Sequence, residues 1–68
     1  MLQRIREALA TLTPTQARRL HARYMLGMKI REIAAMEGVH PSRVSKSIQG
    51  ALERLRRYFA SRKWTNSL

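Results

Sequence analysis

The chain contains no cysteine, few acidic residues, few aromatic residues and no long apolar run, and these shortages exclude several classes of protein. Without cysteine, neither a disulfide framework nor a cysteine-based zinc site can hold the fold together. No apolar run approaches the roughly 18 residues of a membrane-spanning helix, and the N-terminus lacks the apolar core of a signal peptide. We therefore expect a cytoplasmic protein without a membrane partner.

The residue groupings of catalysis and of metal binding are missing as well. The two histidines, His21 and His40, stand nineteen positions apart and have no neighbours that would complete a set of metal ligands. The sequence offers no nucleophile with an acid–base partner and no glycine-rich phosphate loop. We expect no metal, no cofactor and no catalysis.

The chain carries a large excess of basic over acidic residues. Its 68 residues leave room for one domain, which by surface scaling buries only about 60% of the surface of the unfolded chain. Four acidic residues face fourteen lysines and arginines, so the net charge is +10. So large a basic excess in a small domain indicates a polyanionic partner, and nucleic acid is the first candidate.

Residues 30–48 have the pattern of a helix-turn-helix. The first part repeats apolar residues at three- and four-residue spacing, as an amphipathic helix does. Gly38 gives the chain the freedom that a helix end needs, and Val39 is suited to fill the turn. A second helix is expected to begin at Pro41, where the missing N–H of proline costs nothing. The apolar stripe of the first helix is Ile30, Ile33, Ala34 and Met36, and its outer side carries Glu32 and Glu37.

The second helix of the motif is expected to continue well past residue 48, because its apolar spacing continues to Phe59. The side chains on the opposite side are short and polar or cationic, and side chains of this kind donate to phosphates and base edges. This side predicts a recognition helix, although a helix-turn-helix also occurs in proteins that never contact DNA. The recognition face is Ser42, Ser45, Lys46 and Gln49, and the core is expected along Ile33, Val44, Ile48 and Leu52.

Two helices are expected before the motif. Apolar residues at positions 2, 5, 9 and 12 predict an amphipathic helix over roughly residues 2–11 that packs its leucines on the core. Thr13, Pro14 and Gln16 form the start signal of the next helix, and Gly27 is expected to end it. Its inner stripe is expected at Ala17, Leu20, Tyr24 and Met28. Its outer side carries Arg18, Arg19 and Arg23, which either reach a DNA backbone or are simply solvated.

The last helix contains Gly50, which predicts a local bend or close packing against a neighbour. Residues 61–68 lose the apolar periodicity, so we expect one domain over residues 1–60 followed by a frayed tail. Trp64 in this tail either folds back on the core, stacks on a partner or is mobile.

The run from Leu12 to Phe59 resembles region 4 of the sigma-70 family of transcription initiation factors. The resemblance implies an all-α fold, a small bundle of about four helices whose last helix enters the major groove of promoter DNA while another surface docks on RNA polymerase. The other regions of a complete sigma factor do not fit in 68 residues, so the chain is most similar to short free-standing region 4-like proteins of bacterial mobile elements and phages. The matching pieces are Leu12-Thr13-Pro14-Thr15-Gln16, Tyr24-Met25-Leu26-Gly27-Met28, Ile30-Arg31-Glu32-Ile33-Ala34, Gly38-Val39, Val44-Ser45-Lys46-Ser47-Ile48 and Ala51-Leu52-Glu53-Arg54-Leu55-Arg56.

The resemblance also implies which residues meet DNA. It places the base-reading candidates Pro41, Ser42, Ser45, Lys46 and Gln49 at the groove and the phosphate candidate Arg43 near the backbone. Independently of the resemblance, the basic side chains Lys29, Arg31 and Arg54 are further phosphate candidates. The family often has a bulky basic or amide side chain where Ser45 stands, so base reading at this position is expected to differ.

We expect sequence-specific binding of double-stranded DNA in transcription, by a monomer or a homodimer. Two alternatives remain at this point. One is an accessory module that binds RNA polymerase or a sigma factor and binds DNA only weakly. The other is a protein that coats nucleic acid without sequence preference.

Overall fold

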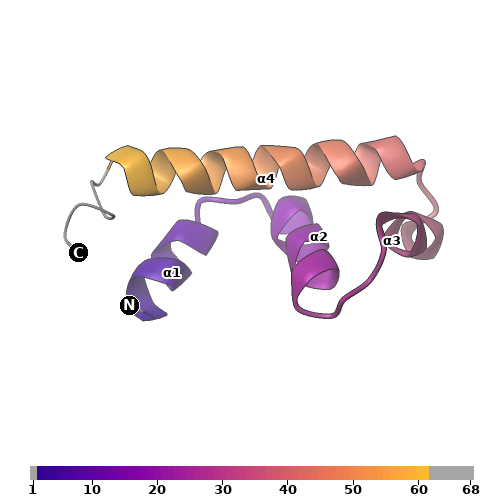
Figure 1. Cartoon of the computed structure of the whole chain (residues 1–68), viewed down its shortest axis with the longest axis horizontal. Coiled ribbons are helices and arrows are strands. Elements are labelled where there is room, and N and C mark those ends of the chain that lie inside the picture. The colour runs from indigo at the N-terminus through magenta and orange to yellow at the C-terminus, as the bar shows by residue number, and fades with distance from the viewer. Residues whose placement is uncertain (1, 62–68) are drawn as a thin grey trace.

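The computed structural model describes residues 2–61, which form four helices and no strand (Figure 1). The predicted all-α fold is confirmed. Seen along α4, α3 lies beside its N-terminal end, α2 beside its middle and α1 toward its C-terminal end. The domain is elongated, with extents of 41 × 18 × 18 Å. The helices are α1 (Leu2–Leu9), α2 (Pro14–Tyr24), α3 (Ile30–Glu37) and α4 (Pro41–Ser61).

The start of α2 is fixed by the predicted capping box. The Thr13 hydroxyl accepts a hydrogen bond from the backbone N–H of Gln16 at 3.1 Å, and the Thr13 N–H donates to the Gln16 side chain at 3.1 Å. The end of α2 differs from the prediction, because the helix stops at Tyr24 and not at Gly27. The chain leaves the helix in a turn in which Met25 and Leu26 both donate to the His21 carbonyl.

The turn between α3 and α4 is the one that the sequence predicts. Gly38 has the left-handed conformation (φ 70°, ψ 33°). The N–H of Val39 donates to the Ala34 carbonyl at 3.0 Å and that of Gly38 to the Ala35 carbonyl at 3.3 Å, which is a Schellman motif. At the start of α3, the Glu32 carboxylate accepts the backbone N–H of Lys29 at 2.8 Å. Glu32 therefore satisfies a backbone donor that the lysine side chain cannot serve.

The core lies where α2, α3 and α4 meet. Ile33 and Val44 are fully buried and Ile48 is buried, as predicted, whereas Leu52 is 37% exposed. The reason is helical geometry, since Leu52 is turned about 80° from Val44 around α4 but Ala51 only about 20°. Ala51 takes the expected place of Leu52. The core cluster consists of Leu12, Leu20, Ala22, Ile33, Ala34, Val44, Ile48 and Ala51.

Several apolar residues expected in the core are exposed instead. Met36 lies on the solvent side of α3, because it is turned about 160° from the buried Ala34. Tyr24, Ile5 and Leu9 are exposed as well. Ala8 of α1 and Ala22 of α2 are buried although the expected stripes did not include them, while Leu20 of the expected α2 stripe is buried as predicted.

Gly50 marks a close approach of α4 to α2. A Cβ atom at this position would lie 3.1 Å from the Nε2 atom of Gln16. Of the two expectations for Gly50, a local bend or close packing against a neighbour, the structure confirms close packing. α4 continues through Ser61, one residue past the expected domain end, and the expectations for Trp64 and the remaining tail lie outside the described residues.

Ile33→Ala tests the assigned core. Removing a fully buried aliphatic side chain leaves a cavity, so the free energy of unfolding is expected to fall by about 2–5 kcal/mol. Met36→Ala is the control on the same helix, and because Met36 is 66% exposed the change is expected to stay within about 0.5 kcal/mol. Urea unfolding followed by circular dichroism measures both. Equal losses for the two variants would contradict this assignment of the core.

Candidate nucleic-acid interface

The N-terminal part of α4 begins at a capped end. Pro41 is the first helical residue, as predicted, and the backbone N–H of Ser42 donates to Nδ1 of His40 at 3.1 Å. This ring nitrogen therefore acts as an acceptor and serves one of the backbone donors that a helix start leaves unpaired. His40 therefore caps the start of α4.

The base-reading candidates lie on one side of α4. Ser42, Lys46 and Gln49 are exposed and follow each other at four- and three-residue spacing, on the side opposite Val44 and Ile48. Two further candidates are half-buried at the edge of this face, namely Pro41 and Ser45. The structure thus brings all five candidates onto the first three turns of α4. We call the exposed set Ser42, Lys46 and Gln49 the recognition face.

The phosphate candidates are more scattered. Lys29 and Arg31 are exposed at the start of α3, and Arg43 is exposed in the first turn of α4. Arg54 lies eleven residues further along the helix, about 16 Å from Arg43. Its Nη1 atom donates to the Thr11 carbonyl at 2.7 Å, which ties α4 to the loop after α1. Arg54 therefore has a structural partner and stands apart from the other three.

Arg19 lies partly buried between helices, although its expected place was on the outer side of α2. Its side chain is 11% exposed and that of its partner Glu37 is 14% exposed. The Nη2 atom of Arg19 lies 2.7 Å from Oε1 of Glu37, and Nε donates to Oε1 at 3.0 Å and to Oε2 at 3.3 Å. The expectation that Glu37 lies on the outside of α3 is wrong for the same reason.

The same guanidinium reaches α4. Its Nη1 atom donates to the Ser47 hydroxyl at 3.1 Å and to the Arg43 carbonyl at 3.5 Å. Arg19 of α2 therefore binds to α3 and to the first two turns of α4 at once. One sequence signal pointed to such a partner, because Glu37 places a negative charge in the last turn of α3, where the helix dipole opposes it.

The hydrogen bond from Arg19 lowers the pKa of Glu37 below its ordinary value of 4.5. The positive charges of Arg19 and Arg18 act in the same direction, while burial of the carboxylate opposes them. The Nη2 atom of Arg18 lies 3.6 Å from Oε1 of Glu37. Arg18 approaches from the solvent side, and its side chain is 60% exposed. Of the three arginines expected on the outer side of α2, Arg23 is also engaged, since its Nη1 atom donates to the Met28 carbonyl at 3.3 Å.

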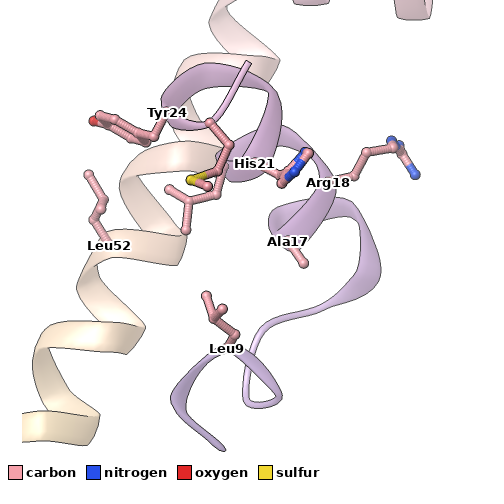
Figure 2. A pocket seen from close by; sticks show the side chains of 8 residues that line it. Leu9, Ala17, Arg18, His21, Tyr24 and Leu52 are labelled. Atoms are coloured by element: carbon pink, nitrogen blue, oxygen red, sulfur yellow. The ribbon is translucent and has the colours of Figure 1, made fainter. Parts of the chain in front are cut away.

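An open apolar groove of about 780 Å³ lies between α1, α2 and α4 (Figure 2). Leu9 reaches into it from α1 and Leu52 borders it on α4, while the guanidinium of Arg18 points away from it. Met25, which lines the groove, is 75% exposed. The sequence did not reveal this groove, because most of its apolar residues were expected in the core. Its lining residues are Leu9, Ala17, Arg18, Leu20, His21, Tyr24, Met25 and Leu52.

Residues 2–61 contain no group of histidine, cysteine and acidic side chains that would hold a metal ion. Within the same range, no helix is long and apolar enough to cross a membrane.

The family model of sigma-70, region 4 matches residues 2–55. The chain therefore belongs to the sigma-70 region 4 family, whose domains are non-enzymatic, bind DNA in transcription initiation and also bind the RNA polymerase core. The match includes α1, which lies before the residues on which the resemblance was based. Neither a curated protein nor a solved structure matches the chain significantly.

Glu37→Gln tests the Arg19–Glu37 ion pair through pH. Because the pKa of Glu37 is lowered in the folded state, the ionised carboxylate stabilises the fold above pH 4.5, and this contribution is lost as the pH falls through the lowered pKa. The difference in unfolding free energy between the parent and Glu37→Gln is therefore expected to be constant near neutral pH and to shrink below about pH 4.5. Urea unfolding at several pH values measures it.

The same substitution made in an Arg19→Met background is the control for this ion pair. Without the guanidinium the main cause of the lowered pKa is gone, so the pH-dependent part of the difference is expected to disappear. A difference between the parent and Glu37→Gln that persists unchanged to about pH 3 would contradict the assignment.

Proposed function

We propose that the chain binds double-stranded DNA sequence-specifically and acts in transcription initiation or its regulation, with the N-terminal part of α4 in the major groove. The observation that carries the proposal is the recognition face, which is exposed at the start of the second helix of a helix-turn-helix. In this motif the N-terminal residues of the second helix contact base edges. Membership in a DNA-binding family supports the same reading.

The chemistry of the recognition face suits base reading. The amide of Gln49 has the donor and acceptor that pair with adenine, and the ammonium of Lys46 donates to the acceptors of guanine. The Ser42 hydroxyl lies 2.9 Å from Nδ1 of His40, and its oxygen is still able to accept a hydrogen bond from a base amino group. Short side chains at Ser42 and Ser45 also let the helix approach the bases closely.

The charge of the domain supports binding to a phosphate backbone. The net charge is +10, and Lys29, Arg31 and Arg43 are exposed cations near or within the motif. The acidic residue of α4, Glu53, is already paired, since its carboxylate oxygens lie 3.1 Å from Arg56 and 3.6 Å from Arg57. Repulsion between this helix and DNA is thereby reduced.

Lys46→Ala and Gln49→Ala test base reading. Each is expected to weaken binding to the preferred duplex by about 1–3 kcal/mol, because a base contact is lost, and to leave binding to a scrambled duplex nearly unchanged. Arg43→Ala removes a phosphate contact, so it is expected to weaken binding to both duplexes equally. It is also expected to reduce the slope of log K against log salt by about one unit. Fluorescence anisotropy titrations at two salt concentrations measure these effects.

Arg4→Ala is the charge-matched control for Lys46→Ala and Arg43→Ala. Arg4 is exposed on α1, remote from the motif, so its removal is expected to change neither the preference nor the salt slope appreciably. Equal losses on both duplexes for Lys46→Ala and Gln49→Ala would mean that α4 binds charge and not sequence. The alternative of a nucleic-acid-coating protein would then be favoured.

The apolar groove favours a second function, contact with RNA polymerase. The family binds the polymerase core, and the groove offers an exposed apolar surface of the kind that protein partners cover. None of the five base-reading candidates lines the groove. Binding to DNA and binding to polymerase therefore use different residues of this domain.

Met25→Asp tests the polymerase contact. Because Met25 is 75% exposed, the substitution is expected to leave the fold intact, while a charge in the lining of the groove should weaken binding of purified bacterial RNA polymerase core by at least about tenfold. Met36→Asp places the same charge at a methionine that is 66% exposed outside the groove, and it should bind polymerase like the parent. Biolayer interferometry compares the three proteins. Equal affinity of both variants, or no binding by the parent, would contradict this function.

A further inference from the structure

We infer that Arg19 is a positioning residue for DNA reading: held by Glu37, its guanidinium fixes the first two turns of α4 through Ser47 and the Arg43 carbonyl. The inference rests on the proposed function, because it concerns how the recognition face is held in place. Arg19 itself lies between helices with its side chain 11% exposed, so it acts on DNA only through α4.

The guanidinium of Arg19 binds α3 with one edge and α4 with the other. Nε and Nη2 bind the Glu37 carboxylate, and Nη1 donates to Ser47 at 3.1 Å and to the Arg43 carbonyl at 3.5 Å. The group is planar and rigid, so fixing the first edge also fixes the direction of the second. The carboxylate at the end of α3 therefore determines where the α4 contacts of Arg19 lie.

The two α4 groups that Arg19 binds are each next to a base-reading candidate. Arg43 directly follows Ser42, and Ser47 directly follows Lys46. Arg43 and Ser47 are also four residues apart, so the contact spans one helical turn. A rotation of α4 about its axis, or a shift along it, would move the recognition face and break these hydrogen bonds together.

The apolar core does not fix the helix in the same way. Val44 and Ile48 are buried, but apolar contacts have no directional preference and permit small shifts of a helix. Hydrogen bonds weaken steeply when their angles change. A buried ion pair can also often be replaced by apolar residues without loss of stability. What the Arg19–Glu37 pair contributes beyond stability is therefore orientation.

The test replaces the pair by apolar residues of similar size, Arg19→Met with Glu37→Leu. This double variant is expected to unfold cooperatively with a melting temperature near that of the parent. Its affinity for the preferred duplex relative to the scrambled duplex is expected to fall by about tenfold, which corresponds to the loss of one well-aligned base contact. Its affinity for the scrambled duplex is expected to stay within about twofold of the parent value. Ser47→Ala, which keeps the pair and removes one α4 acceptor, is expected to show a smaller loss of preference.

Arg18→Met is the matched control. It removes a cation beside the same carboxylate, 3.6 Å away, but from an exposed position, and the preference between duplexes is expected to stay at the parent value. Residual dipolar couplings of backbone amides in α2 and α4 supply a second readout without DNA. They are expected to report a changed orientation of α4 in the double variant and an unchanged one in Arg18→Met.

Each outcome decides the inference. A double variant that folds with parental couplings and parental preference overturns it. If the double variant does not fold, the same two measurements are made on Ser47→Ala. A Ser47→Ala variant with the parental preference and the parental couplings then overturns the inference. If the parent itself does not distinguish the duplexes, the proposed function fails, and unchanged couplings in the double variant would separately overturn the positioning role.

Discussion

The burial of one side of α4 holds this domain together. Val44, Ile48 and Ala51 are buried, and α1, α2 and α3 each pack against α4. A straight helix that buries one stripe leaves its opposite side to solvent, and at the N-terminal end that side carries Lys46 and Gln49. The packing that stabilises the fold thus also exposes the recognition face.

Features that depend on neighbouring residues could be predicted from the sequence. The capping box of Thr13 and Gln16 and the left-handed Gly38 form within one helical turn, so the local sequence contains all the groups involved. Ile33 and Val44 were predicted correctly as core residues because each lies at the centre of its apolar stripe. The family could be identified from the order and spacing of these same pieces.

Features that depend on the limited size of the core could not be predicted. Apolar spacing indicates which side of a helix is available for burial, but not whether another helix covers it, and Leu9 and Leu52 border an open groove for that reason. Arg19 and Glu37 are eighteen residues apart and meet only after α2 and α3 have packed. The exposure of Ser42, Lys46 and Gln49 followed from periodicity, whereas their contacts with bases remain a prediction because they depend on the partner.

Selection of bound duplexes from a random-sequence DNA library measures the central claim, sequence-specific binding, most directly. The parent protein is used at about 0.15 M salt, where exposed charges are screened beyond about 8 Å and non-specific attraction is weakened. Our account predicts strong enrichment of one short motif, and two copies at a fixed spacing would additionally indicate a dimer. A bound pool with the same sequence composition as the starting library would contradict it.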